Sequence, residues 1–202
     1  MKRFLGLVLV ALAAVAATAP AHAEDVNLNF YPFAPRYLDK DTWDPVENQY
    51  AFGGTVDFGK AGWPLHFAIG LHGSVGDEAN FNPLVSGVTG TVNELSFGIA
   101  KIWTTKGTVR PFLSGGVSFV HAAADADLFT GTIDSDDDSI GMWVEGGVYW
   151  RLSPHFNLGM FGRMLTGTSI TLFENVPGFE ADGDTDYFEW GPMLGWSWPP
   201  KK

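Results

Sequence analysis

Residues 141–152, GMWVEGGVYWRL, alternate bulky apolar side chains with charged, polar or small ones at a period of two. Val144 and Trp150 share one parity, whereas Glu145 and Arg151 share the other. Period two is the period of a β-strand, whose successive side chains point to opposite faces. In a soluble sheet the apolar parity faces a core. In a sheet closed on itself in lipid it faces outward, and the polar parity fills the lumen.

Eight such runs are predicted along the chain, and 25 glycines and 12 prolines in 202 residues suit strands and turns better than helices. The runs cover residues 26–33, 50–58, 64–75, 92–103, 108–121, 139–152, 155–170 and 185–198. Pro192 in the last run has no N–H to give to a ladder, which predicts a bulge or kink.

The links between the runs alternate in length. Short links are predicted at residues 59–63, 104–107 and 153–154, and long ones at 34–49, 76–91, 122–138 and 171–184. An even number of antiparallel strands with short turns at one end and longer loops at the other is typical of outer-membrane barrels. The sequence therefore predicts an all-β fold: an eight-stranded antiparallel up-and-down transmembrane β-barrel with short periplasmic turns and longer extracellular loops.

Residues 1–23 are predicted to be a cleaved signal peptide, because a basic start precedes an apolar run that ends in the small-x-small pattern Ala-His-Ala. Residues 24–202 then form one barrel domain. No later apolar segment reaches the ~18 residues of a membrane-spanning helix. The chain has no Cys, which excludes disulfides and thiolate metal sites, and its net charge of −11 argues against binding nucleic acid through phosphates. We expect an integral protein of a bacterial outer membrane.

Aromatic side chains gather next to the short turns and at the end of the last run. They are Trp63, Trp103, Trp150, Phe156 and Trp198. In an outer-membrane barrel these residues would form the periplasmic aromatic girdle, in contact with outer-membrane lipids. Lys101 lies near the same end on the lipid-facing parity, where a long side chain reaches the interface.

The lumenal parity carries three acids and three bases. They are Glu94, Arg110, Glu145, Arg151, Arg163 and Glu189. Because an eight-stranded barrel is just wide enough for side chains to fill, these groups are predicted to form one hydrogen-bonded charge network. A path for protons or solutes is the alternative interpretation.

The segments TVRPFLSGGVSF and GMWVEGGVYWRLSPHFNLGMFGR, with an aromatic-alternating final strand, resemble the OmpA-like and OmpX-like small outer-membrane barrels. The resemblance covers essentially the whole chain after residue 23. It implies this fold and assembly by the barrel assembly machinery, which usually recognises a terminal aromatic residue. Here Trp198 is followed by Pro199, Pro200, Lys201 and Lys202. Such barrels include structural proteins, adhesins and a few lipid A modifying enzymes, so no chemistry is implied.

One constellation could carry enzyme chemistry. His72 and Ser74, with Glu78 following, resemble the His-x-Ser of outer-membrane lipid A deacylases. A nucleophilic Ser needs a base within hydrogen-bond reach and an acid that orients the base. Parity, however, sends His72 and Ser74 toward the lumen, away from a lipid substrate. Small polar side chains that fill the lumen are the favoured interpretation.

A second constellation is acidic. Asp134, Asp136, Asp137 and Asp138 crowd together in a predicted surface loop. Asp134, Asp136 and Asp138, with Glu145, follow part of an EF-hand spacing, but Ser139 replaces the required Gly. Weak binding of Ca²⁺ or Mg²⁺ by this acidic tip is one hypothesis, and a solvated loop is the other.

The remaining long links, around residues 37–49 and 173–186, combine acids with aromatics. They could bind a partner from a rigid scaffold or pack together to close the barrel. The favoured function is a non-enzymatic outer-membrane protein with a structural or surface-interaction role, in contact with lipopolysaccharide. A lipid A modifying enzyme and a soluble periplasmic ligand-binding barrel are the alternatives, and no cofactor is expected.

Overall fold

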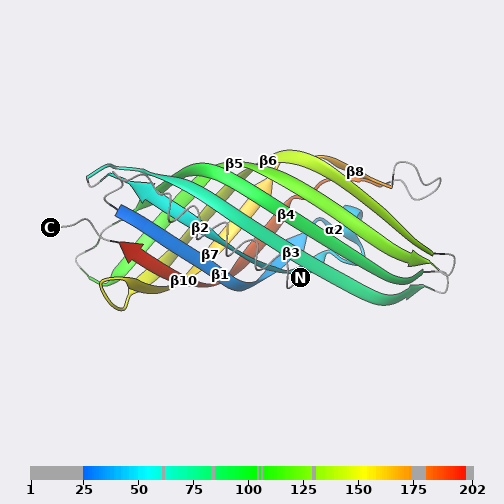
Figure 1. Cartoon of the computed structure of the whole chain (residues 1–202), viewed down its shortest axis with the longest axis horizontal. Coiled ribbons are helices and arrows are strands. Elements are labelled where there is room, and N and C mark those ends of the chain that lie inside the picture. The colour runs from blue at the N-terminus through cyan, green and yellow to red at the C-terminus, as the bar shows by residue number, and fades with distance from the viewer. Residues whose placement is uncertain are drawn as a thin grey trace.

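The computed structural model describes residues 25–60, 62–82, 85–103, 105, 107–128, 131–173 and 181–198. Eight tilted strands close into one barrel (Figure 1). They are β1 (Asp25–Leu38), β2 (Asn48–Gly59), β3 (His66–Asn82), β4 (Val85–Ile102), β5 (Val109–Leu128), β6 (Gly131–Arg151), β7 (Phe156–Thr166) and β10 (Tyr187–Trp198). Their order is β1-β10-β7-β6-β5-β4-β3-β2, with β2 paired back to β1 and all pairs antiparallel. The predicted all-β, eight-stranded antiparallel barrel is confirmed.

The two ends of the barrel differ. Short links at residues 60–65, 103–108 and 152–155 lie at the end where β1 begins, which we call the turn end. The opposite end, which we call the hairpin end, carries the tips of β3–β4 and β5–β6 (Figure 1). The predicted signal peptide lies outside the described residues. Among the described residues, no helix has the length and apolar character needed to cross a membrane.

The outward side chains of β3, β4, β5 and β6 form rows, because the register between these strands is regular. One row consists of Leu71, Leu95, Phe119 and Ile140. The next row toward the hairpin end consists of Gly73, Asn93, His121 and Asp138. The apolar band of the outer wall therefore ends between these two rows. On β5 it extends from Val109 to Phe119, about the 9–11 residues of a tilted transmembrane strand.

Beyond this band, β3–β4 and β5–β6 continue as two paired hairpins. Only residues 83–84 and 129–130 separate their strands. Most of the predicted long links 76–91 and 122–138 is therefore strand, and the predicted strand limits were wrong there. These extensions consist largely of Thr, Ala, Ser, Gly and Asp. They lack the bulky apolar parity that identified the other strands, but backbone pairing does not depend on it.

Strand β1 contains an extra residue that changes which of its side chains face the lumen. Its register with β2 shifts between Tyr31 and Ala34, so the inward parity passes from Asn29 and Tyr31 to Ala34 and Arg36. Its register with β10 is broken over the same stretch, opposite Pro192. The bulge expected in the last run from Pro192 lies instead in the partner strand β1, and β10 keeps a regular register with β7 through Pro192.

Residues of the links fold back and close the hairpin end of the lumen. The short helix α2 (Lys40–Trp43) buries Trp43, whose indole Nε1 donates to the Asp184 carbonyl oxygen at 2.8 Å. The small sheet β8 (Ile170–Leu172) and β9 (Ala181–Gly183) packs Ile170 and Leu172 into the same core. The sequence left two hypotheses for these links, binding of a partner or packing together to close the barrel. The burial of Trp43 supports the second.

The inner face of β6 holds β8 in place through side chains. Ser139 Oγ, Asp137 Oδ2 and Ser135 Oγ accept hydrogen bonds from the backbone N–H groups of Ser169, Thr171 and Phe173, each at 2.8 Å. Alternate residues of one segment thus bind alternate residues of the other. In this way the backbone N–H groups on the edge of β8 that does not pair with β9 have hydrogen-bond acceptors.

Candidate functional site

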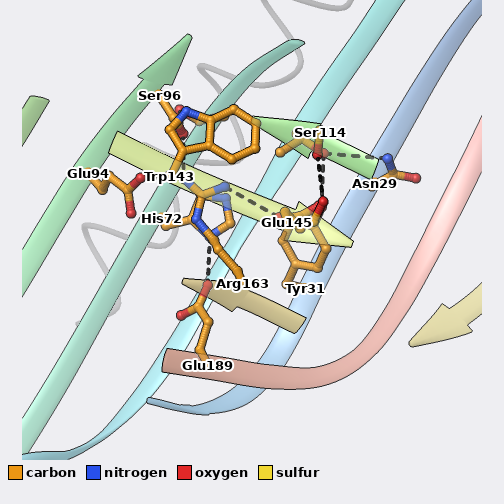
Figure 2. A network of polar contacts seen from close by, with 12 residues as sticks. Asn29, Tyr31, His72, Glu94, Ser96, Ser114, Trp143, Glu145, Arg163 and Glu189 are labelled. Carbon is orange, nitrogen blue, oxygen red and sulfur yellow. Dashed lines mark hydrogen bonds and ion pairs between the residues drawn. The ribbon is translucent and has the colours of Figure 1, made fainter. Parts of the chain in front are cut away.

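Arg163 of β7 lies at the centre of the lumen. Its guanidinium forms ion pairs with Glu94 Oε1 and, at 3.3 Å, with Glu145 Oε2. Its Nε donates to the Tyr187 hydroxyl at 2.9 Å, and its Nη2 donates to Ser96 Oγ at 3.0 Å. All five side chains are buried. Figure 2 shows the Glu94 and Glu145 carboxylates on opposite sides of this centre.

A second group is built on Arg36 of β1. Arg36 Nε donates to Glu189 Oε2 at 2.8 Å, and Nη1 donates to Ser74 Oγ at 3.1 Å. The Ser74 hydroxyl in turn donates to Gln49 Oε1 at 2.6 Å. His72 Nδ1 lies 3.3 Å from the other oxygen of Glu189 (Figure 2). Strands β1, β2, β3 and β10 are thereby joined across the lumen.

Tyr31 connects these two groups. Its hydroxyl donates to Glu145 Oε1 at 2.7 Å, and its ring stacks on His72 with centroids 5.2 Å apart. On the turn-end side, Asn29 Nδ2 donates to Asp57 Oδ2 at 3.0 Å. We call the whole set the lumenal charge network, made of Asn29, Tyr31, Arg36, Gln49, Asp57, His72, Ser74, Glu94, Ser96, Glu145, Arg163, Tyr187 and Glu189.

Both buried guanidinium groups also lie over aromatic rings. Arg36 Cζ is 3.8 Å from the centroid of Tyr187, and Arg163 Cζ is 4.3 Å from that of Trp143. The planar guanidinium stacks on such a ring while its edge still donates to carboxylates. Arg163 therefore has its face and its edge engaged, whereas Arg36 has its face, Nε and Nη1 engaged and its Nη2 buried without a hydrogen-bond partner.

This geometry fills the lumen with fixed charges. Each of the three buried Glu side chains faces a guanidinium, and Glu189 also faces an imidazole. An unpaired charge at such a place would carry a large desolvation cost. The arrangement suits a barrel held together from within, since its members come from seven of the eight barrel strands.

The structure brings together four of the six predicted lumenal charges: Glu94, Glu145, Arg163 and Glu189. It does not bring in Arg110 and Arg151, which lie at the turn end. Arg151 is six residues beyond Glu145 on β6, about 20 Å along a strand. Within the described part of the chain, neither Arg pairs with a carboxylate, so the single six-membered network is corrected to a smaller central one.

Arg36, Tyr31 and Tyr187 were missed as members of the network. The predicted first strand ended at residue 33, because the bulge in β1 breaks its parity. Tyr187 lies in the last predicted run, two residues before Glu189 and on the same parity, but was not named as a member. An Arg in an otherwise apolar segment, next to a parity break, is the signal that could have identified Arg36.

The His-x-Ser constellation is engaged in other contacts. His72 and Ser74 face the lumen, as parity predicted. The Ser74 hydroxyl donates to Gln49, and His72 faces Glu189. Glu78 is exposed on the β3–β4 hairpin. The hydroxyl, imidazole and carboxylate that a nucleophilic triad requires are thus directed to different partners.

The predicted girdle residues all lie at the turn end with partly exposed rings. Their exposed fractions are 51% for Trp63, 44% for Trp103, 38% for Trp150, 36% for Phe156 and 44% for Trp198. Trp198 contacts Trp196 edge-on, with centroids 6.4 Å apart. A ring of half-exposed aromatics at one end of an apolar wall has the form expected of an interfacial girdle.

The acidic residues 134–138 lie in strand β6 and not in a loop, which corrects the loop prediction and the EF-hand spacing. Asp134, Asp136 and Asp138 point outward, and Asp137 points inward to β8. Asp138 Oδ1 lies 2.9 Å from His121 Nδ1 of β5. Among the described residues, no three His, Asp or Glu side chains are arranged to hold a metal ion. Weak binding of Ca²⁺ or Mg²⁺ stays a prediction.

Just below that His–Asp pair, the outer wall is hollowed. A groove of about 830 Å³ is lined by the apolar row Leu71, Leu95, Phe119 and Ile140, with His121 and Asp138 at its edge. Its lining also includes four residues of the inward parity, His72, Glu94, Val120 and Ser139, and His72 and Glu94 belong to the lumenal charge network. The groove marks the level at which the apolar wall gives way to the polar hairpins.

Comparison with known proteins shows which fold this is. No protein-family model and no curated protein matches the sequence. Among solved structures, Neisserial surface protein A matches with a TM-score of 0.52 and 14% identity, over 85% of this chain and 95% of that one. Ail, the attachment invasion locus protein of Yersinia pestis, matches with a TM-score of 0.54 and 10% identity, over 87% and 99%. The chain has the fold of a small outer-membrane β-barrel.

The outer-membrane barrel fold accounts for the direction of the side chains. Outward residues of this barrel are apolar through the middle of the wall and aromatic at the turn end, as is typical of outer-membrane barrels. Inward residues are polar and buried. The fold expected from the resemblance to OmpA-like and OmpX-like barrels is confirmed. At these identities the comparisons extend to the fold alone.

Proposed function

We propose that this chain is an integral, non-enzymatic protein of the bacterial outer membrane that carries a surface-interaction platform. The observation that supports the proposal most strongly is the abrupt end of the apolar outer wall. Leu95 and Phe119 are followed one row later by Asn93 and His121. A membrane boundary at this level leaves the β3–β4 and β5–β6 hairpins outside the lipid and the short turns in the periplasm.

A soluble periplasmic barrel is a weaker interpretation. It would need an apolar cavity inside and a polar wall outside. In this chain Trp190, Phe97 and Met142 point outward with exposed fractions of 45%, 39% and 64%, whereas Glu145 and Arg163 fill the inside. Exposed apolar surface of this extent would drive aggregation in water.

An enzyme acting on lipid is also a weaker interpretation. Its nucleophile would have to face the bilayer, but the Ser74 side chain is buried in the lumen with Arg36 and Gln49 as partners. The lumenal charge network has the character of a structural plug. We therefore assign it to stability and not to catalysis or conduction.

The surface role is supported by the charge of the hairpins. The outward face of β5–β6 carries Asp125, Asp127, Asp134, Asp136 and Asp138. Asp125 and Asp134 are direct cross-strand partners, so like charges sit side by side on a paired and ordered backbone. A partner with clustered positive charge would relieve this repulsion.

The names of the matching proteins are compatible with a surface role, since one is a surface protein and the other an attachment protein. Ail is also known in complex with the heparin analogue sucrose octasulfate. That ligand is a polyanion. The acidic hairpins of this chain would repel it, so its partner chemistry differs from that complex.

The test is binding of a fluorescent oligolysine peptide to the purified chain in lipid nanodiscs. We expect saturable binding that weakens with salt and is lost when Asp125, Asp127, Asp134 and Asp136 are all changed to Asn. A matched control changes Asp39, Asp41, Asp44 and Asp182, acids outside the β5–β6 hairpin, to Asn. Equal binding by wild type and the hairpin variant would overturn the surface-interaction role.

A further inference from the structure

A separate cavity lies at the turn end of the barrel. Its volume is about 240 Å³, and its walls include His66, Arg110, Tyr149 and Arg151, with Lys60 from the β2–β3 link. These residues come from the ends of the strands and from one short link. The cavity is therefore distinct from the central lumenal charge network and opens at the end opposite the hairpins.

The charge of this cavity is opposite to that of the whole chain. The sequence has a net charge of −11, yet Lys60, Lys101, Arg110 and Arg151 all line this one space. The acid on its wall is Asp25, whose Oδ2 lies 3.6 Å from His66 Nε2. Asp57, deeper in the lumen, is bound by Asn29. Positive charge thus exceeds negative charge around the opening.

Arg110 and Arg151 are near neighbours of like charge. Arg110 is the cross-strand partner of Tyr149, and Arg151 is two residues further along β6 on the same face. Such diagonal neighbours have Cα atoms ~7–8 Å apart, close enough for long side chains to converge. Arg36 and Arg163 each have a carboxylate partner. In the described residues Arg110 and Arg151 have none.

Polar atoms of three residues that line this cavity lack a hydrogen-bond partner. The Nε atoms of Arg110 and Arg151 are buried without a hydrogen-bond partner in the structure. Nδ1 of His66, a residue only 9% exposed, is also buried without a partner, and this nitrogen is a donor only when it carries the proton. Buried donors without acceptors are rare in folded proteins and call for a ligand that supplies the acceptor.

We propose that this cavity binds a phosphate group. A phosphate offers several acceptor oxygens and a negative charge to two guanidinium groups, whose donor forks match its geometry. The volume is below the ~300–1,000 Å³ of sites for drug-sized ligands, which fits a small anion or the single phosphate group of a larger molecule. The group could come from free phosphate or from the headgroup of a phospholipid at this end, because Trp63 lies at the same opening.

The test uses the full chain folded in a nonionic detergent and isothermal titration calorimetry with two probes. One probe is inorganic phosphate, and the other is a short-chain phosphatidylglycerol added to the micelles. We expect at least one probe to bind, and Arg110→Gln/Arg151→Gln to weaken that binding by about tenfold or more. Lys40→Gln, which removes an exposed charge from α2 at the other end, serves as the control and should bind like wild type.

The pattern of binding identifies the source of the phosphate. Binding of inorganic phosphate supports a soluble anion, and binding of the lipid alone supports a headgroup. If neither probe binds to the wild type, or if the double variant binds as well as the wild type, the proposal is overturned. Equal weakening by Lys40→Gln would reduce the effect to general electrostatics and overturn it as well.

A second measurement does not depend on the folding of the double variant. Phenylglyoxal modifies accessible arginines, and mass spectrometry of the wild-type chain reports each one. We expect whichever probe binds to slow modification of Arg110 and Arg151, while Arg36 and Arg163 remain unreactive in both conditions because they are buried and paired. Modification of Arg110 and Arg151 at the same rate with and without that probe would contradict the site.

Discussion

Arg163 shows how a single residue organises the interior of this barrel. Its guanidinium binds two carboxylates, a hydroxyl of Tyr187 and the face of Trp143. These four partner residues come from β4, β6 and β10, whereas Arg163 itself lies in β7. Removing this one side chain would leave Glu94 and Glu145 as buried charges without their main partner.

We therefore predict that Arg163→Ala lowers the free energy of unfolding by about 3–5 kcal/mol, the cost of breaking a buried ion pair. Thermal unfolding in detergent, followed by circular dichroism, measures the effect. Asp136→Ala is the control, because Asp136 is exposed on the outer face of β6 and should change stability by no more than about 0.5 kcal/mol. Equal melting temperatures for the two variants would rule out the lumenal charge network as a source of stability.

Two glycines, Gly98 and Gly116, explain how Trp143 fits beside Arg163. Gly98 and Gly116 are cross-strand partners on the inward face of β4 and β5. A Cβ on Gly98 would lie 2.2 Å from the Gly115 carbonyl oxygen and 2.8 Å from the Trp143 ring. A side chain is therefore excluded at this position, and the indole occupies the space.

Single residues could be assigned from sequence only where parity held. Glu94, Glu145, Arg163 and Glu189 were identified because each lies in an unbroken period-two run. Arg36 was not, because an extra residue in β1 reverses the parity before it. Partner choice was also beyond sequence reasoning, since Arg163 reaches Glu94 across the lumen from a strand that is not its neighbour.

At the scale of elements, β8 depends on side chains of β6 for its position. Three acceptors on alternate residues of β6 bind three N–H groups of the segment 169–173. Asp137 supplies the middle bond, from its Oδ2 to Thr171 N at 2.8 Å. The neighbouring Asp136 points to the opposite face of the same strand.

This pair of neighbours provides a matched test. We predict that Asp137→Ala increases amide hydrogen exchange at Thr171 and its neighbours, because the edge of β8 loses an acceptor. Asp136→Ala should leave exchange there unchanged. Mass-spectrometric or NMR exchange measurements in micelles distinguish the two. Equal protection of Thr171 in both variants would show that β8 does not depend on this side-chain ladder.

A second element outside the barrel wall is a turn held by Asp186. Its carboxylate accepts from the hydroxyls of Thr166 and Thr168, each at 2.7 Å, and from the N–H groups of Gly167 and Thr168, each at 3.0 Å. Partial burial opposes the charged form, but these hydrogen bonds outweigh it and lower the pKa of Asp186 below its ordinary value of 3.8. The positive φ of Gly167, 81°, lets the backbone turn toward the carboxylate.

The sign of the pH dependence follows from this lowered pKa. A carboxyl with a depressed folded pKa stabilises the turn above its ordinary pKa, and that contribution is lost as the pH falls through the folded value. We predict that protection of the Gly167 and Thr168 amides is intact at neutral pH and declines below pH 3.8. In Asp186→Asn it should already be reduced at neutral pH and change little on acidification. A wild-type turn that is equally protected across this range would contradict the assignment.

Elements were predictable from sequence where apolar side chains mark one face. The eight runs follow from the period-two alternation of apolar and polar side chains, and the links between them alternate in length as is typical of outer-membrane barrels. The continuation of β3–β6 into long hairpins did not follow, because Thr, Ala, Ser and Asp leave no apolar parity. The small sheet β8–β9 was also not anticipated, since its stability comes from contacts with β6 and α2 that are distant in sequence.

At the scale of the whole molecule, three levels succeed one another along the barrel axis. The turn end carries half-exposed aromatics around a basic cavity. The middle combines an apolar outer wall with the lumenal charge network. The hairpin end is closed by Trp43, Ile170 and Leu172 and bears acidic outer faces. Charge is thus distributed unevenly along the barrel axis, with a basic opening at one end and an acidic surface at the other.

This layered arrangement depends on where the membrane meets the outer wall. The natural chain has no Cys, so single cysteines can be introduced along β6 without background. Its outward residues pass from Asp134 and Asp136 to Val144 and Val148 across the proposed boundary. Reaction of each cysteine with a membrane-impermeant maleimide in intact cells reports whether that position faces water or lipid.

The most direct measurement is this labelling series in cells that express Asp134→Cys, Asp136→Cys, Val144→Cys or Val148→Cys. We predict that the first two react and that the last two do not, although all four react after denaturation. The change should fall between residues 138 and 140, where the polar row meets the apolar row. Reaction at all four positions, or recovery of the protein in the soluble periplasmic fraction, would contradict an outward lipid-facing wall and with it the whole account.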